Sequence, residues 1–304
     1  MRGRRLLVGQ LTLIAAVTVL SYAVPSLLPV WRGLIGVTSV AVMLAGVARH
    51  RPRRRLPWLM LAGALLAFTV GVVGAVLSAD GVPGLPLVSN ICFLGLFTPL
   101  AAGGLLGLAR TGLASRDRSG LLDVLILTAA TGLLAWTFVI QPFVDLPGLP
   151  LGERALGVAY PASAVLVFAM LARLASVARR NPAALLLLVG GLGNFGAGVL
   201  YGLTNLGAEL SITETANLTW PLLNGAWAAA CQHPAMRSLT EPRPVGPTEV
   251  GPLRLAVLAT ALLLAPATLA VEVAVGSVPE VVVAAGLTVA IFLLVLSRLT
   301  GALE

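Results

Sequence analysis

The sequence has little charge and no lysine. Charged residues make up 11% of its 304 positions, and all 20 basic residues are arginines. Soluble domains carry about 25% charged residues. A chain with 58% hydrophobic residues therefore has too few polar groups to cover a surface that faces water. This composition excludes an ordinary soluble globular protein and indicates one that lies in a membrane.

Cysteine is scarce, and the common catalytic motifs are missing. Cys92 and Cys231 both lie in or beside apolar runs and share no C-x-x-C spacing, which excludes a disulfide framework and a cysteine-based zinc site. The sequence contains no G-x-S-x-G, H-E-x-x-H or Walker motif, and no GGDEF or EAL string. We therefore predict that this chain is not itself an enzyme and that it holds no cofactor and no metal.

The net charge of +8 comes from arginines that stand in short clusters between apolar runs. A nucleic-acid-binding face combines basic residues with aromatic and polar ones. These clusters lack that pattern, so we predict no nucleic-acid partner. Every second loop is basic, and only Arg32 and Arg154 fall on the opposite side. By the positive-inside rule, both termini are expected to be cytoplasmic.

Ten runs of mostly apolar residues are long enough to cross a bilayer, which takes about 20 residues. The predicted fold is all-α, a polytopic membrane bundle of about ten transmembrane helices that forms a single integral membrane domain, with the lipid bilayer as its partner. The predicted spans are Leu6–Val24, Trp31–Ala48, Trp58–Leu77, Val88–Ala109, Gly120–Ile140, Leu156–Val177, Ala183–Leu203, Thr215–Cys231, Leu253–Val271 and Val281–Ser297. Within the domain, residues 1–119 hold the first four helices, 120–242 the next four and 243–304 the last two.

One glycine pattern matches a nucleotide-binding motif as a string. Gly191-x-Gly193-x-x-Gly196 has the spacing of a dinucleotide fingerprint, which requires a strand before it and a helix after it. Here the glycines lie inside an apolar run with no strand before them. We therefore predict that they allow close packing between helices.

Polar residues lie at helical spacing on two neighbouring spans. Asn217, Trp220 and Asn224 stand at i, i+3 and i+7, and Asn194 and Tyr201 are also seven residues apart, so each set shares one helix face. Lipid tails offer these groups no hydrogen-bond partners. The two stripes are expected to face each other or a cavity in the outer half of the bundle. Two interpretations stay open: structural hydrogen bonding between helices, or a pocket for an unknown small molecule or lipid.

Asp123 is the one carboxylate placed inside a predicted span. An ionised side chain in a membrane is costly unless it is paired. Asp123 is therefore either a boundary residue paired with Arg116, Arg118 or Arg173, or part of a site.

Several of these residues resemble those of a known family. Trp220, followed by the exit Ala-Cys-Gln-His-Pro-Ala-Met-Arg at 230–237, resembles the multi-helix membrane region of actinobacterial GGDEF and GGDEF–EAL cyclic-di-GMP signalling proteins. Asp123 and Trp136 resemble the start of that family's D…W…P pattern, and Tyr160 followed by proline resembles its Tyr-Pro helix.

The resemblance has departures as well as matches. Tyr201, followed by glycine and leucine, resembles the family's seventh span, but Ala164 stands where we expect an aspartate after Tyr-Pro. Two further positions that are acidic in the family are occupied by Gly198 and Asn217. The candidate residues for a ligand site or an interhelical polar cluster are Asp123, Trp136, Tyr160, Asn194, Tyr201, Asn217, Trp220 and Asn224.

The resemblance implies a membrane sensor or anchor in the bacterial plasma (inner) membrane. Its last helix would pass a conformational change to a cytoplasmic diguanylate cyclase that is absent from this chain. A homodimer is implied by the same analogy, because that cyclase assembles its active site across a dimer. The competing interpretation is a ten-helix small-molecule transporter of the drug/metabolite exporter type, built from two inverted halves; the halves of this sequence share no visible motif.

Overall fold

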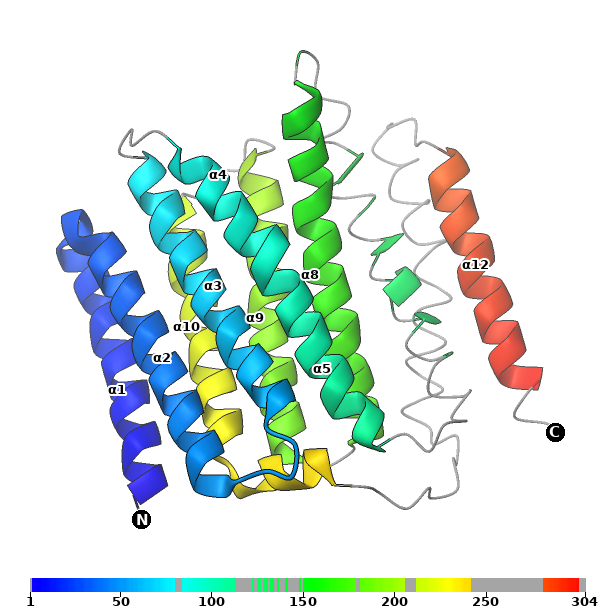
Figure 1. The fold of residues 1–304 in the computed structure, drawn as a ribbon. Helices are drawn as coiled ribbons and strands as arrows, with labels where there is room; N and C mark the ends of the chain where they lie inside the picture. The colour runs from blue at the N-terminus through cyan, green and yellow to red at the C-terminus, as the bar shows by residue number, and fades with distance from the viewer. Residues whose placement is uncertain are drawn as a thin grey trace.

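The computed structural model describes residues 2–79, 84–112, 150–178, 181–205, 212–241 and 281–300, with scattered positions between 122 and 148. Every element in these residues is helical. The long helices from α1 to α10 stand side by side, and α12 runs alongside at a distance from them (Figure 1). The prediction of an all-α fold is confirmed for the described part of the chain.

The apolar runs fold as helices because each backbone N–H and C=O group then finds its partner within the same segment. The described helices lie over every predicted span except the fifth and the ninth. The fifth span is described only at scattered positions, and the ninth lies outside the described residues. In chain order the elements are α1 (Arg2–Ala23), a 3-10 turn (Pro25–Leu27), α2 (Leu28–His50), α3 (Leu56–Ala79), α4 (Leu85–Asn90), a π-helical segment (Ile91–Phe97), α5 (Thr98–Gly112), α8 (Leu151–Val177), α9 (Pro182–Asn205), α10 (Ile212–Gln232), the 3-10 helix η4 (Pro234–Thr240) and α12 (Val281–Thr300).

Four of the described helical segments are long and apolar enough to cross a membrane. They are Leu28–His50, Leu56–Ser78, Leu85–Ala109 and Leu151–Ala172. These segments indicate a multi-pass membrane protein. The number of ten spans stays a prediction.

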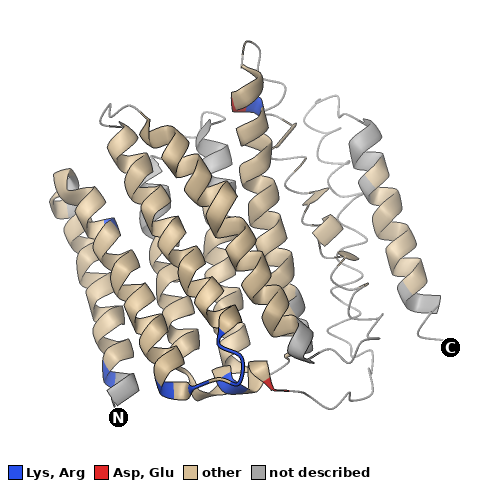
Figure 2. Cartoon of the chain, viewed as in Figure 1, with Lys and Arg blue, Asp and Glu red and all other residues tan. Residues whose placement is uncertain are grey.

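Basic residues gather at one end of the bundle, which we call the arginine end (Figure 2). It includes Arg49 at the end of α2, the arginines of the connection to α3, and Arg237 in η4. Helix α1 begins and α12 ends toward this same side (Figure 1). Arg32 does not belong to it: at about 1.5 Å per residue, Arg32 lies roughly 25 Å along α2 from Arg49.

Helix α10 packs against α1, α2 and α9, and small residues bring the backbones close together. A Cβ atom at Gly46 of α2 would overlap the carbonyl oxygen of Cys231, and one at Gly190 of α9 would overlap the indole of Trp227. The Trp227 Nε1–H donates a hydrogen bond of 3.2 Å to the Leu187 carbonyl of α9. Close approach of this kind drives helix association where lipid supplies no hydrophobic force between helices.

The three glycines of the fingerprint-like string lie inside α9. A Cβ atom at Gly193 would lie 3.1 Å from the carbonyl oxygen of Thr219 in α10, and one at Gly191 would overlap the Leu171 side chain of α8. The prediction of close helix packing is confirmed for Gly191 and Gly193, whereas a Cβ atom at Gly196 would make an ordinary contact with Thr219 at 3.9 Å.

A π-helical segment interrupts the long helix between α4 and α5. Pro99 has no N–H to offer the carbonyl of Gly95, and its ring would clash with that carbonyl in a regular α-helix. The Thr98 hydroxyl instead donates a hydrogen bond of 2.9 Å to the Phe93 carbonyl, five residues earlier. The wider turn sets the directions of Phe93 and Phe97, which both line a cavity.

We predict that Gly46→Ala lowers the stability of the bundle by about 1–3 kcal/mol, because the added methyl group overlaps the backbone of α10 and the helices must separate. Thermal unfolding of the purified protein in detergent measures the loss. Gly9→Ala in α1 is the matched control, since a Cβ atom there meets nothing within 4 Å. An equal loss in the two variants would contradict the close contact of α2 with α10.

Candidate functional site

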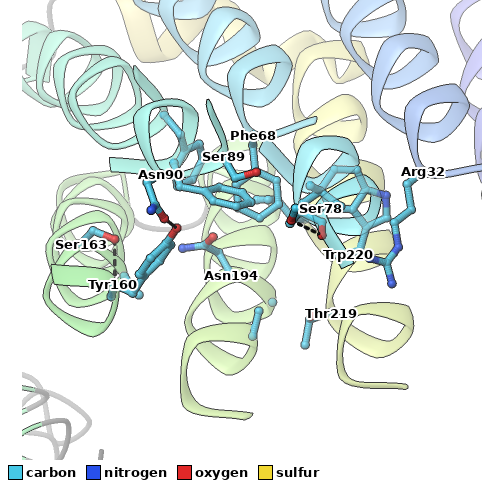
Figure 3. A pocket seen from close by; sticks show the side chains of 18 of the residues that line it. Arg32, Phe68, Ser78, Ser89, Asn90, Tyr160, Ser163, Asn194, Thr219 and Trp220 are labelled. Carbon is cyan, nitrogen blue, oxygen red and sulfur yellow. Dashed lines mark hydrogen bonds between the residues drawn. The ribbon is translucent and has the colours of Figure 1, made fainter. Parts of the chain in front are cut away.

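A cavity of about 320 Å³ lies among α2, α3, the α4–α5 helix, α8, α9 and α10 (Figure 3). This volume is near the lower end of the range for small-molecule sites, about 300–1,000 Å³. Arg32 of α2 is one of its lining residues, so the cavity lies toward the half of the bundle away from the arginine end. Tyr160, Asn194 and Trp220 also line it.

One side of the cavity is a row of four aromatic rings, which we call the aromatic wall. Phe93 meets Tyr160 edge-on at 5.9 Å between ring centroids and Phe68 edge-on at 5.1 Å. Phe68 is in turn stacked on Trp220 at 5.1 Å, with 18° between the ring planes. Because each aromatic contact contributes beyond simple burial, the wall is a stiff apolar surface that joins α8, the π-helical segment, α3 and α10.

Polar groups face the same space. The Tyr160 hydroxyl donates a hydrogen bond of 2.6 Å to Asn90 Oδ1. Asn194 is only 8% exposed and makes no hydrogen bond to any described residue. Arg32 is 6% exposed, and its Nε and Nη2 atoms are buried without an acceptor in the described part of the chain. An apolar wall with a few unsatisfied polar groups is typical of a ligand pocket.

Three of the predicted site residues therefore meet at one place: Tyr160, Asn194 and Trp220 all line the cavity. Asn224 does not join them. It is fully buried, and its Nδ2 donates a hydrogen bond of 3.1 Å to the Trp220 carbonyl of its own helix. Among the described residues, neither Asn194 nor Asn224 makes a side-chain hydrogen bond between α9 and α10.

The other predicted site residues either lie away from the cavity or fall outside the part of the chain that the structure describes. Trp136 packs in a separate cluster with Ile140 and Val165. Asp123 lies outside the described residues, as do the side chains of Tyr201 and Asn217, although the backbones of these last two belong to α9 and α10.

Sequence reasoning missed most residues of the site, among them Arg32, Asn90, Phe68 and Phe93. Arg32 carried a signal, because it is one of the two arginines on the side opposite to the basic loops. Asn90 lies within an apolar run, where no second polar residue marked its helix face. Phe68 and Phe93 carried no signal, since a phenylalanine that faces lipid and one that lines a cavity give the same apolar pattern.

A second polar cluster ties the end of α10 to its neighbours at the arginine end. We call it the exit clamp; it consists of Gln232, His233 and η4 with their partners on α2 and α9. The Gln232 side chain donates a hydrogen bond of 2.7 Å to the Val42 carbonyl of α2. His50 Nε2 donates one of 3.0 Å to the Gln232 carbonyl, and Arg237 Nε donates to the His50 carbonyl.

Asn181 joins the exit clamp to α9. Its Nδ2 donates hydrogen bonds to the Ala235 carbonyl, at 3.1 Å, and to Ser238 Oγ, at 2.8 Å. Its Oδ1 accepts from the backbone N–H groups of Ala183 and Ala184 at 2.9 and 3.2 Å, as a helix N-cap does. With Pro182 at the first position of α9, Asn181 fixes both the start of that helix and the place of η4.

Comparison with known protein families, with curated proteins and with solved structures finds no match. Within the described residues, no group of three or more His, Cys, Asp or Glu side chains is placed to hold a metal ion.

We predict that Asn181→Ala destabilises the exit clamp by about 1–3 kcal/mol, because it leaves buried groups unpaired and removes the cap of α9. η4 then opens more often, and trypsin cleaves after Arg237 faster in the purified protein. Mass spectrometry of the fragments measures this rate. Asn181→Asp is the matched variant: it keeps the cap acceptor and loses only the two donated bonds, so its cleavage rate should lie between those of the wild type and Asn181→Ala. Wild-type cleavage of Asn181→Ala would contradict the role of Asn181.

Proposed function

We propose that this chain is the membrane sensor or anchor module of a bacterial signalling protein, and that it controls a cytoplasmic diguanylate cyclase outside this chain. The observation that carries the proposal is that α10 reaches both the cavity and the exit clamp. Trp220 lines the cavity, and Gln232 is bonded to α2 at the arginine end. At about 1.5 Å per residue, the two positions are roughly 18 Å apart along one helix.

The residues that carry the family resemblance support this proposal by their placement. Tyr160 and Trp220 line the cavity, as does Ala164, which stands where we expect an aspartate. The exit sequence from Gln232 to Arg237 forms most of the exit clamp. The resemblance thus falls on the two parts of the bundle that a sensor needs, a place for a ligand and a contact at the cytoplasmic exit.

The mechanism is a change in helix packing. A ligand shifts the balance between two packings only by the difference in its affinity for them. A ligand that fills the cavity displaces Trp220 relative to Phe68, and α10 passes that displacement to the exit clamp. Control of a cyclase that works as a dimer then follows from the position of the helix ends, and the protein is proposed to act as a homodimer in the plasma membrane with both termini in the cytoplasm.

One observation favours the alternative function, a small-molecule transporter. The cavity lies beside the π-helical segment Ile91–Phe97, and transporters form substrate sites at irregular stretches of membrane helices. Uptake of a cavity ligand into vesicles that contain the protein would favour this alternative, whereas binding without uptake favours the sensor.

The coding sequence beyond codon 304 tests the proposed function directly: we expect an in-frame GGDEF domain.

We further predict that Trp220→Ala in that full protein changes the cellular level of cyclic-di-GMP at least several-fold, because it removes the stacked contact with Phe68 and enlarges the cavity. Leu222→Ala is the control. Leu222 lies on the same helix and is exposed on the bundle surface, so its loss should leave the level unchanged. A stop codon directly after codon 304, together with unchanged cyclic-di-GMP on expression of the chain, would contradict the proposal.

A further inference from the structure

Arg32 is a cation that the described part of the protein leaves without a partner. It is 6% exposed, two of its guanidinium nitrogens are buried with no acceptor, and no carboxylate stands among the described residues that line the cavity. A buried charge without a counter-charge is strongly destabilising, and ionisable residues inside a membrane are retained where they have a function. No described residue supplies the counter-charge of Arg32, which leaves the guanidinium free to receive an acidic group in the cavity.

We propose that the cavity binds a small amphiphile with a single acidic group, a carboxylate or a phosphodiester, and that this group pairs with Arg32. The inference rests on the proposed function, because it names the ligand class of the same cavity. It goes further in fixing the charge of the ligand and the residue that recognises it.

The layout of the cavity fits such a ligand. In Figure 3, Arg32 stands at one side, the Tyr160–Asn90 pair at the other, and Phe68 and Asn194 between them. The apolar body of the ligand lies along the aromatic wall, which offers it a flat surface. The Asn194 amide, which has no partner among the described residues, is left to bond a polar group in the middle of the ligand.

The single positive charge of Arg32 sets which ligand charge the cavity prefers. Arg32 is the only charged residue among the described ones that line the cavity. A monoanion neutralises it, whereas a dianion leaves one negative charge buried and a neutral amphiphile leaves the guanidinium unpaired. Both of the latter cases carry the cost of an unpaired charge in a low-dielectric site. A cationic amphiphile adds repulsion and is excluded.

Two sources supply this chemistry: a free carboxylate amphiphile, or the phosphodiester of an anionic lipid in the outer leaflet. The full chain is reconstituted in nanodiscs of phosphatidylcholine and titrated with decanoate, decanol and decyltrimethylammonium, with the thermal unfolding temperature as the readout. A ligand that binds only the folded protein raises this temperature. We expect decanoate alone of the three probes to raise it.

Arg32→Gln is the decisive variant. It should weaken decanoate binding by about 30-fold or more, the fold-change that corresponds to the ~2 kcal/mol lost when one partner of a buried charge pair is removed. Without ligand, Arg32→Gln should unfold at a higher temperature than the wild type, because an unpaired buried charge has been removed. Arg49→Gln is the matched control on the same helix, where the arginine is exposed at the arginine end; it should bind decanoate as the wild type does. Arg32→Lys keeps the charge and loses the planar fork, so it should bind decanoate more weakly but with the same order among the probes.

Nanodiscs that contain phosphatidylglycerol separate the two sources. An unfolding temperature raised by this lipid in the wild type but not in Arg32→Gln identifies the lipid phosphodiester as the occupant. A decanoate response that this lipid leaves unchanged identifies a free amphiphile. The proposal is overturned if wild type and Arg32→Gln respond equally to decanoate and to phosphatidylglycerol, or if neither probe raises the unfolding temperature of the wild type.

Failure of this proposal and failure of the proposed function are distinguishable. If no monoanion binds while Trp220→Ala still changes cyclic-di-GMP, the cavity senses another class of ligand and the signalling function stands. If a monoanion binds through Arg32 while no GGDEF domain is encoded, the ligand class stands and the signalling function falls.

Discussion

The structure depends on one constraint: hydrocarbon offers no hydrogen-bond partner to a polar group. The backbone meets this constraint by folding every described element as a helix. Polar side chains meet it at the arginine end, where His50, Asn181 and Gln232 bond to neighbouring segments. At the cavity, Arg32 and Asn194 do not meet it within the described part of the protein. The Oε1 atom of Gln232 at the arginine end is also buried without a partner, but the cavity differs in holding an unpaired charge, which costs more to bury than an unpaired amide oxygen.

Hydrophobic periodicity predicted the helices well, because an apolar run long enough to cross a bilayer has few other ways to satisfy its backbone. Polar residues at helical spacing led to Asn194 and Trp220, since they need a common environment, and the family resemblance led to Tyr160. The hydrogen-bond partner of Asn224 could not be predicted, because an amide reaches the carbonyl four residues back in its own helix as readily as it reaches a neighbouring helix. The aromatic wall could not be predicted either, because the direction of Phe93 depends on the π-helical turn before Pro99, which periodicity does not reveal.

Helix α10 owes its proposed role to how its neighbours hold it. At Gly46 of α2 and Gly193 of α9 its backbone carbonyl oxygens, those of Cys231 and Thr219, lie directly against the neighbouring helix. Flexible side chains at a helix interface absorb small displacements by changing rotamer, and backbone contacts have no such freedom. In the proposed mechanism, a displacement at Trp220 is passed along α10 to Gln232, where the exit clamp joins it to α2 and α9.

The two cysteines lie at informative places in this arrangement. Cys92 is buried in the π-helical segment beside the cavity, and Cys231 is fully buried where α10 crosses Gly46. A thiol reacts with alkylating reagents only when it is accessible and ionised, so each stays silent while its surroundings are closed. The sequence thus carries two chemical reporters, one for loosening of the π-helical turn and one for separation of α2 from α10. Their labelling rates would follow the two ends of the proposed pathway without any added probe.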